Sequence, residues 1–343
     1  MSEQGIRIEH KNNNLVIRSA TLEDASLLTT WWNDGTVMAH AGFPLGLNQT
    51  IEETKKQIES NFSRLSQLCI IESNNYRIGE VSFGIGEGYA EIGIKLCEST
   101  YQNKGLGTIV LQMLIEFLFH DPKLNQNTQI ERIILDTNLT NLRAQHVYEN
   151  LGFKRLSIHY NAWEDQLGTL QSCIDYELTR AQYEDGVRYI IDPEEKEEIA
   201  RTILNALPDW FGIPENTEEY IIKSKELPFF AYYKDNQYVG FITLKETSPY
   251  TAELFVMGVL KTYHHQKIGT KLFHQFTRYT QSKNYEFIQV KTVDAGHYEE
   301  YDKTRLFYEQ MGFKKLETFP TLWDEWNPCL IMIQSIKKSS KEE

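Results

Sequence analysis

Gln102, Gly105 and Gly107 stand just before an apolar run, in the stretch "YQNKGLGTIVLQML" from 101 to 114. The first N–H groups of a helix have no partner within that helix and lie at the positive end of its dipole. Glycine lets an anion approach such a backbone closely, because it has no Cβ. The stretch therefore predicts a loop whose amides, from Gln102 to Gly107, hold a diphosphate. It matches neither GxxxxGK[ST] nor a GxGxxG motif with an acidic residue about 20 positions on.

The same kind of stretch occurs a second time, as "YHHQKIGTKLFHQF" from 263 to 276. Gly107 and Gly269 lie 162 residues apart. Another repeated motif, "VYENLGFK" with Gly152 and "FYEQMGFK" with Gly312, lies 160 residues apart. Because two motifs repeat at nearly one spacing, we expect a duplicated domain. We place the domains at 1–182 and 187–336, with a polar linker over 181–186 and a disordered tail over 337–343.

The elements around these motifs follow one order in each half. In the first half we expect strands at 15–18, 68–73, 76–85, 90–96, 130–138 and 173–180, and helices at 21–34, 107–119 and 141–153. Thr21 with Asp24 indicates a capping box, and Asn74–Asn75 indicates a tight turn. In the second half we expect strands at 187–192, 251–260 and 285–293, a hairpin over 228–245 turning at Asp235–Asn236, and helices after Gly269 and over 304–313. The predicted class is α/β (α+β), with two mixed, largely antiparallel sheets flanked by helices.

Composition restricts the class of protein. The 343 residues suggest two ordinary domains. The sequence contains no run of 18 or more apolar residues, so we expect no membrane span. The start has no apolar signal-peptide core, and the four cysteines show no CxxC or zinc spacing, so we expect a cytoplasmic protein without a metal. The net charge of −13 argues against nucleic acid and fits a cationic substrate, although acidic surfaces also serve solubility alone. Monomer and homodimer both stay open.

Two blocks in order carry a family resemblance. "QNKGLG", between a strand and a helix, fits (Q/R)-x-x-G-x-(G/A), and "NLRAQHVYENLGF" fits N-x-x-A-x-x-x-Y-x-x-x-G-F. Together they resemble the GCN5-related N-acetyltransferase (GNAT) superfamily, and the second block is most similar to the RimJ/RimL branch. The resemblance covers nearly the whole chain as two tandem copies. It implies an enzyme that uses acetyl-CoA, releases CoA, and acetylates a primary amine by direct attack.

The resemblance also implies site residues in the first half. The strand ending in "IKL" would splay from the next strand and pair with the pantetheine arm, while the loop would hold the pyrophosphate. The implied cofactor residues are Ile94, Lys95, Leu96, Gln102, Asn103, Lys104, Gly105, Leu106, Gly107, Thr108 and Asn141.

Catalysis in such a fold needs an acid and a base. Tyr148 is similar to the family's general acid for the departing thiolate, although it also fits a core aromatic residue. Glu91 matches the place of a carboxylate that deprotonates the amine through water, although it also fits a surface glutamate. Asp136, at the end of its strand, would bind a cationic substrate. Positioning and oxyanion donors supply the rest, without a covalent intermediate.

The second copy departs from the pattern. Lys267 stands at the position of Gly105, Tyr301 at that of Asn141, and Thr304 at that of Ala144. Its Tyr308 and Glu253 correspond to the predicted acid and base. Its predicted cofactor residues are Val259, His264, His265, Gln266, Lys267, Ile268, Gly269 and Thr270. Because "LPDWFGIPENTEEY" and "PTLWDEWNPCLIM" resemble the ends of one acetyltransferase subgroup, both halves stay possible enzymes.

The acceptor is less defined. "LLTTWWNDGTVMAHAG" resembles the acceptor-facing segment of the RimJ/RimL branch and of aminoglycoside 6'-acetyltransferases, which places Trp31 and Trp32 at the substrate, although one of the two also fits the core. The aminoglycoside enzymes have an acidic residue where this chain has Lys95. We therefore keep a small cationic amine such as an aminoglycoside, a polyamine-like amine, and a peptide N-terminus. One domain could also be a non-catalytic module that binds acetyl-CoA or substrate.

Overall fold

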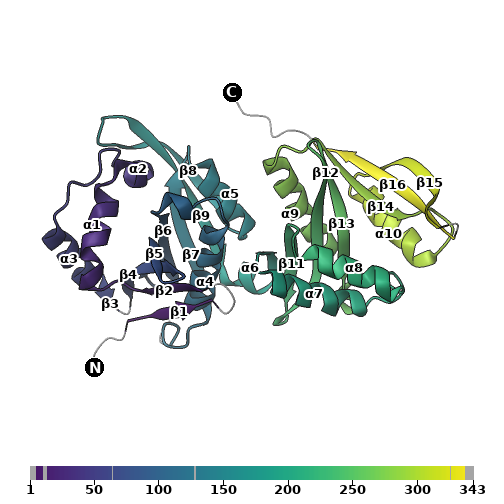
Figure 1. Ribbon diagram of the computed structural model, residues 1–343, viewed down its shortest axis with the longest axis horizontal. Helices are drawn as coiled ribbons and strands as arrows, with labels where there is room; N and C mark the ends of the chain where they lie inside the picture. Colours follow the sequence, from purple (N-terminus) through teal and green to yellow (C-terminus); the bar gives the residue numbers. More distant parts are fainter. Residues whose placement is uncertain (1–4, 11–13, 64, 127–128, 325, 337–343) are drawn as a thin grey trace. The chain divides into compact units, whose positions relative to one another are not determined.

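The computed structural model describes residues 5–10, 14–63, 65–126, 129–324 and 326–336. The chain divides into two compact units, Met1–Gln182 and Tyr183–Glu343. The predicted disordered tail, 337–343, lies outside the described residues. Each unit contains a sheet with helices packed on it (Figure 1).

The first sheet has the strand order β1-β2-β4-β5-β6-β7-β9-β8, with the short β3 paired to β4. The β6–β7 pair is parallel and the other pairs are antiparallel, which confirms the mixed, largely antiparallel sheet. The strands are β1 (Arg7–Glu9), β2 (Leu15–Ser19), β3 (Phe62–Ser63), β4 (Ser66–Ser73), β5 (Tyr76–Ile85), β6 (Tyr89–Leu96), β7 (Arg132–Asn138), β8 (Lys154–Glu164) and β9 (Leu170–Thr179).

Helices cover both faces of this sheet. They are α1 (Ala25–Asn33), α2 (Gly35–Met38), α3 (Ile51–Ser60), α4 (Leu106–His120) and α5 (Leu142–Asn150). Figure 1 shows α1 and α3 on one side of the strands and α4 on the other. One core cluster joins Leu28 and Trp32 of α1 to Ile70 of β4. The opposite face packs against α4, whose apolar residues are almost completely buried.

The second sheet has the order β10-β11-β12-β13-β14-β16-β15, and its β13–β14 pair is parallel. Its strands are β10 (Gly186–Ile190), β11 (Phe229–Lys234), β12 (Gln237–Ser248), β13 (Thr251–Val259), β14 (Phe287–Val293), β15 (Lys314–Asp324) and β16 (Asn327–Ser335). Its helices are α7 (Pro193–Asn205), α8 (Pro214–Ser224), α9 (Ile268–Ser282) and α10 (Glu299–Gln310). Alternate residues of β11 enter two cores, since Phe229 packs with α7 while Phe230 packs with α9.

Several local predictions are confirmed. Asn74, Asn75, Asp235 and Asn236 all have positive φ, as two-residue hairpin turns require. The Thr21–Asp24 capping box forms at the start of the first helical segment.

Other local features differ from the prediction. The expected polar linker over 181–186 is largely helical, since α6 spans Arg180–Glu184 and Gly186 begins β10. Its start is held in place because the Arg180 guanidinium donates to Ile130 O (2.9 Å) and Asn125 Oδ1 (3.0 Å). Within the described residues, no helix has the length and apolar character needed to cross a membrane.

Candidate active site

The parallel strands of the first unit separate partway along their length. The β6–β7 ladder pairs Tyr89 with Arg132, Ala90 with Ile133 and Glu91 with Ile134, and it ends there. β6 continues to Leu96 and remains paired with β5 on its other side. The predicted pantetheine residues Ile94–Leu96 therefore lie on a strand edge that faces the gap. Such an edge can pair with an extended amide-containing ligand.

The loop before α4 closes one end of this gap. Asn103 (φ 60°) and Gly105 (φ 77°) are left-handed, and a Cβ at Gly105 would have no atom within 4 Å. The N–H groups of Gln102 and Thr108 donate to Ser99 O (3.1 Å) and Gly105 O (3.0 Å). The amides between these two, from Asn103 to Gly107, are therefore the better candidates for holding a diphosphate.

Side chains connect this loop to its surroundings. Gln102 Nε2 donates to Leu96 O (2.8 Å), which fixes the loop at the end of β6. Its Oε1 accepts a long hydrogen bond from Arg143 of α5 (3.3 Å). Asn141 caps its own helix, because Oδ1 accepts from the Ala144 amide (3.2 Å). A contact of Asn141 with a cofactor would therefore compete with this cap.

Tyr148 lies on α5 with only 7% of its surface exposed. Its ring packs against Phe153 and Tyr176, with centroid distances of 6.0 and 5.6 Å. Burial, together with the negative charge of Asp136, raises the pKa of Tyr148 to about 12. The phenol therefore stays protonated at neutral pH and can give a proton away, but it cannot serve as a base.

Three carboxylates share one face of the sheet. Glu91 pairs with Ile134, so Asp136 two residues further on lies on the face of Glu91, and Asp136 pairs with Asp175 of β9. Burial and the neighbouring Asp175 raise the pKa of Asp136. Burial opposes ionisation of Asp175, but hydrogen bonds from Ser157 (2.6 Å) and His159 (2.7 Å) leave its pKa lowered. This face can attract a cation beside the gap.

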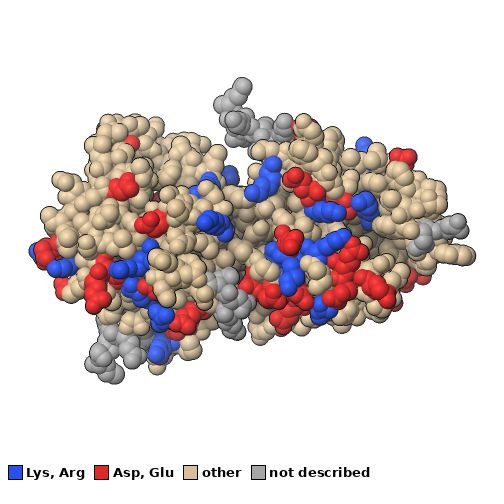
Figure 2. Space-filling model, viewed as in Figure 1, with Lys and Arg blue, Asp and Glu red and all other residues tan. Residues whose placement is uncertain are grey.

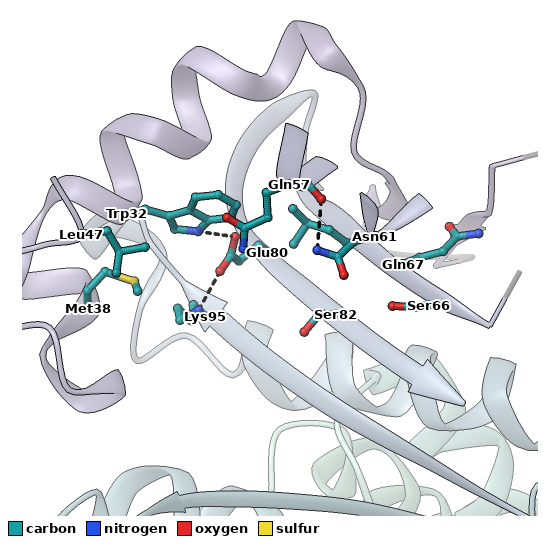
Figure 3. Close-up of a pocket in the computed structure, with 11 residues that line it drawn as sticks. Trp32, Met38, Leu47, Gln57, Asn61, Ser66, Gln67, Glu80, Ser82 and Lys95 are labelled. Atoms are coloured by element: carbon teal, nitrogen blue, oxygen red, sulfur yellow. Dashed lines mark hydrogen bonds and ion pairs between the residues drawn. The ribbon is translucent and has the colours of Figure 1, made fainter. Parts of the chain in front are cut away.

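A pocket of about 220 Å³ lies on the same face, between the helices α1 and α3 and the strands β4–β6 (Figure 3). We call it the Glu80 pocket. Glu80 is buried, with 4% of its surface exposed. Its Oε2 accepts from Trp32 Nε1 (2.9 Å), and its Oε1 accepts from Lys95 Nζ (2.8 Å). The lining residues are Trp32, Met38, Leu47, Gln57, Asn61, Ser66, Gln67, Leu68, Glu80, Ser82 and Lys95.

The two adjacent tryptophans have different places. Trp32 lines the Glu80 pocket, as a substrate-facing residue would. Trp31 is not among the lining residues, and its Nε1 donates to Glu98 Oε1 (2.8 Å) at the end of β6. Both indoles are 4% exposed and belong to the core cluster under α1. Of the two, only Trp32 also borders the pocket, a difference that the sequence did not show.

The second unit repeats the backbone of the first. Its parallel ladder ends at Leu254 and Val290, which leaves the rest of β13 facing a gap. His265 (φ 62°) and Lys267 (φ 61°) take the left-handed conformations of Asn103 and Gly105. The loop thus keeps its shape although lysine pays a steric cost at this φ that glycine does not.

Side-chain contacts nevertheless cross the second gap. Trp210 Nε1 donates to Thr304 Oγ1 (3.0 Å) of α10, and its ring meets His264 at a centroid distance of 5.9 Å. His264 is bonded to Val259 O (2.8 Å), at the end of β13, and the Tyr301 hydroxyl donates to Trp210 O (2.7 Å). Trp210 therefore links the β13 side of the gap to the α10 side.

The helix start of the second loop is also crowded. A Cβ placed at Gly269 would meet Met257 Cε at 3.1 Å and the Phe307 ring at 3.4 Å. A Cβ at the corresponding Gly107 would meet only Leu96 Cδ1, at 3.5 Å. The side chains of β13 and α10 thus come close together at Gly269, whereas α5 leaves Gly107 more open.

The predicted acid and base of the second unit are also enclosed. Tyr308 is 7% exposed, and burial raises its pKa. Glu253 is 5% exposed and accepts from Lys291 Nζ (2.9 Å) and Gln289 Nε2 (3.0 Å). A carboxylate already paired with a lysine is poorly placed to take a proton from an amine.

Three residues of interest escaped the sequence prediction. Glu80 left a signal, because it is the charged residue that interrupts the otherwise uncharged strand segment "IGEVSF". Asp175 alternates with the apolar residues of "CIDYEL", which indicates only that it faces away from the core. Trp210 left no signal of its role, because its partners on α10 lie about ninety positions away in the chain.

Comparison with known proteins agrees with this geometry. Two family models described as "Acetyltransferase (GNAT) domain" match residues 14–154 and 225–315, which together make up more than half of the chain. The chain is 26% identical over 162 residues to an aminoglycoside N(6')-acetyltransferase type 1 of Klebsiella pneumoniae, covering 43% of this chain and 78% of that protein. It is 37% identical over 68 residues to a kanamycin resistance protein of Rhizobium radiobacter, covering 20% and 57%.

Solved structures are also similar, at lower sequence identity. A spermidine N-acetyltransferase of Vibrio cholerae, in complex with CoA and spermine, has a TM-score of 0.43 at 18% identity, covering 50% of this chain and 98% of its own. An acetyltransferase of Salmonella typhimurium that modifies the N-terminal serine of ribosomal protein L7/L12 has a TM-score of 0.43 at 19% identity, covering 51% and 99%.

The chain belongs to the GNAT acetyltransferase family, with two such domains in tandem. It is an N-acetyltransferase that uses acetyl-CoA.

Proposed function

We propose that the first unit moves the acetyl group of acetyl-CoA to a primary amine of a small cationic acceptor, such as an aminoglycoside. The observation that carries this proposal is that the gap between β6 and β7 begins just beyond Glu91, and that Asp136 and Asp175 lie on the same face of the sheet as Glu91. A free strand edge suits the pantetheine arm, and the carboxylates suit a cation. The aminoglycoside N(6')-acetyltransferase relative supports this choice of acceptor.

Each residue has a definite role in this proposal. The amides between Gln102 and Thr108 hold the pyrophosphate, and Ile94–Leu96 pair with the pantetheine arm. Glu91 accepts a proton from the ammonium through water, and the free amine attacks the thioester carbonyl. The C–N bond forms, the C–S bond breaks, and Tyr148 gives its proton to the departing thiolate. After the attack the nitrogen loses a second proton to solvent. Tyr148 then takes a proton back from solvent, and Glu91 releases its proton to solvent.

Acetylation of a peptide N-terminus is the second candidate. The Glu80 pocket favours it, because side-chain amides of Gln57, Asn61 and Gln67 line its wall. Such amides can pair with a peptide backbone as donors and acceptors. A peptide also needs only one cationic group, the reacting amine.

We propose that the second unit binds acetyl-CoA more weakly than the first. His264–Thr270 and Val259 would hold acetyl-CoA there only after Trp210 leaves its place between His264 and Thr304. Two observations support this. The loop keeps the left-handed conformation at Lys267, and the side chains across the gap are hydrogen-bonded to one another.

The test is thiol release from acetyl-CoA in the presence of an amine panel. The panel contains kanamycin, spermidine, and a peptide with a free N-terminal serine. The proposal expects release that depends on the amine and is largest with kanamycin. Release with the peptide alone would favour the second candidate, and no release with any amine would refute acetyl transfer to these classes.

A further inference from the structure

The ion pair of the Glu80 pocket bears on acceptor selection. The Glu80 side chain is 6% exposed and that of Lys95 is 34% exposed, with 2.8 Å between Oε1 and Nζ. Both oxygens of Glu80 are engaged, because Trp32 Nε1 donates to Oε2. Glu80 and Lys95 are the charged members of the lining, and the remaining lining residues are uncharged. The pocket therefore has no net formal charge.

Lys95 also connects the pocket to the predicted reaction centre. Its backbone belongs to the free edge of β6, where the cofactor arm would lie. Its side chain lies on the face of Glu91, because residues 91, 93 and 95 alternate with those that face α4. An acceptor whose amine lies near Glu91 would thus extend its other end along this face toward Lys95 and the pocket.

We propose that Lys95 determines acceptor specificity: by neutralising Glu80, it makes the pocket select an uncharged, hydrogen-bonding end of the acceptor and reject a second ammonium. A second cation would be repelled by Lys95 and would find Glu80 already paired. A hydroxyl or amide end would meet Ser66, Ser82, Gln57 and Asn61, which donate and accept. This inference rests on the proposed function of the first unit and specifies which part of the acceptor enters the pocket. For an aminoglycoside, that part is a hydroxyl-bearing end, and the other ammonium groups stay outside the pocket, on the face of Glu91, Asp136 and Asp175.

Matched acceptors test the proposal. 4-Amino-1-butanol and 1,4-diaminobutane have the same length and differ in a terminal hydroxyl or ammonium. We expect the wild-type chain to show a kcat/KM at least about tenfold higher for the amino alcohol, and Lys95→Met to shift the ratio toward the diamine by about tenfold. The ratio, measured at one acetyl-CoA concentration, cancels any change in cofactor binding.

A second variant, Glu80→Gln, gives the pocket a net positive charge. Glu80→Gln leaves Lys95 as an unpaired cation, so that this variant should gain activity with 4-aminobutanoate relative to 4-amino-1-butanol. The double variant Glu80→Gln/Lys95→Met should discriminate little among the three acceptors. Unchanged acceptor ratios in both single variants would overturn the proposal.

A binding measurement separates this inference from the proposed function. In thermal unfolding, 1,4-diaminobutane should raise the Tm of Lys95→Met more than 4-amino-1-butanol does, because it can replace the lost cation beside Glu80. It should raise the wild-type Tm less than the amino alcohol does. If no amine is acetylated, the proposed function fails while this comparison still decides the inference. Equal shifts by the two ligands in both proteins would contradict the role of Lys95.

Discussion

At the residue scale, the two predicted catalytic tyrosines are equally buried but differently placed. Tyr148 is influenced by the charge of Asp136, on the open acidic face of the first unit. Both tyrosines pack against aromatic rings, but within the described part of the chain the charged group that influences Tyr148 has no counterpart at Tyr308, whose pKa is raised by burial and by the neighbouring Tyr301 and Tyr220. The same residue type at equivalent positions therefore supports a catalytic role in the first unit more than in the second.

Replacement of Tyr148 by Phe tests this difference. We expect Tyr148→Phe to lower kcat by about 10²-fold or more, because the thiolate loses its proton donor, with the KM for acetyl-CoA little changed. Since burial raises the pKa of Tyr148 to about 12, the wild-type rate should not fall between pH 8 and 10 through loss of this proton. Steady-state kinetics over this pH range provide the measurement. Tyr308→Phe is the matched control and should keep full turnover; a loss there would reverse the assignment.

Glu91 can be tested against its counterpart in the same way. Glu91→Gln should lower kcat/KM at pH 7, where the amine is mostly protonated and needs a base. The deficit should shrink as the pH approaches about 10, because the amine of a typical acceptor then loses its proton without help. Glu253→Gln should leave turnover unchanged, since Glu253 is engaged with Lys291. A deficit of Glu91→Gln that does not vary with pH would contradict the base role.

At the scale of the elements, the two cofactor loops have one backbone shape and different sequences. Lys267 has a φ of 61° at the start of α9, where Gly105 has 77° at the start of α4. We expect Lys267→Gly to stabilise the second unit by about 1 kcal/mol, because the left-handed conformation strains a residue with a Cβ. Urea denaturation measures this. Lys267→Ala is the control, because it removes the charge and keeps the strain; equal gains in both variants would show that strain is not the cause.

The first helix begins at a buried ion pair between Asp24 and Arg18. This pair makes the stability of the first unit depend on pH. Asp24 is 1% exposed and accepts from Arg18 through both oxygens (2.8 and 2.9 Å). Burial opposes its ionisation, but Arg18 and Thr21 outweigh it and lower the pKa of Asp24 to about 2. Its contribution is therefore present above its ordinary value of 3.8 and is lost as the pH falls through about 2.

Asp24→Asn tests this contribution. It should destabilise the first unit by about 3 kcal/mol at pH 7, because Arg18 loses its buried partner. The difference from wild type should narrow between about pH 4 and pH 2, as Asp24 itself becomes protonated. Denaturant unfolding at a series of pH values measures this. The exposed pair of Glu9 with Arg7 offers a control, and Glu9→Gln should change stability little. A constant difference down to pH 2 would contradict the argument.

The elements that the sequence predicted are those with strong local signals. The strands around Asn74–Asn75 and Asp235–Asn236 have turn residues with a defined conformation, and α4 has a continuous apolar pattern. β8 was not predicted, because its residues are mostly exposed and, among the described strands, it pairs with β9 alone. An edge strand of this kind lacks the apolar alternation on which strand prediction depends.

At the scale of the whole molecule, the acidic residues behind the net charge of −13 fall into two groups, those paired with nearby basic residues and those that can attract a cation. Figure 2 shows acidic and basic side chains interleaved over α7 and α8. There Arg201 pairs with Glu197 and Glu218, and Lys225 pairs with Glu194 and Glu197. Acidic residues on that surface are thus neutralised locally. The carboxylates of Glu91, Asp136 and Asp175 are better placed to attract a cationic acceptor.

The duplication itself was predictable from the sequence, whereas the unequal state of the two gaps was not. Repeated motifs at one spacing reveal a repeated fold. The contacts that cross the second gap join Trp210 to His264 and to Thr304, residues far apart in the chain. Lys267 alone suggested an altered loop, but its backbone proves to be unaltered. The two gaps therefore differ in their side chains, those of Lys267 and Trp210 among them, and not in the backbone of the loop.

A calorimetric titration of the full chain with acetyl-CoA tests this central claim most directly. We predict one tight site per chain, in the first unit, and a second site that is much weaker and strengthens when Trp210 is replaced by Ala. The tight site should weaken in Gly105→Lys, because a lysine side chain then stands beside the diphosphate, as Lys267 does in the second unit. Two equally tight sites in the wild-type chain, or a second site that does not strengthen when Trp210 is replaced by Ala, would contradict this claim.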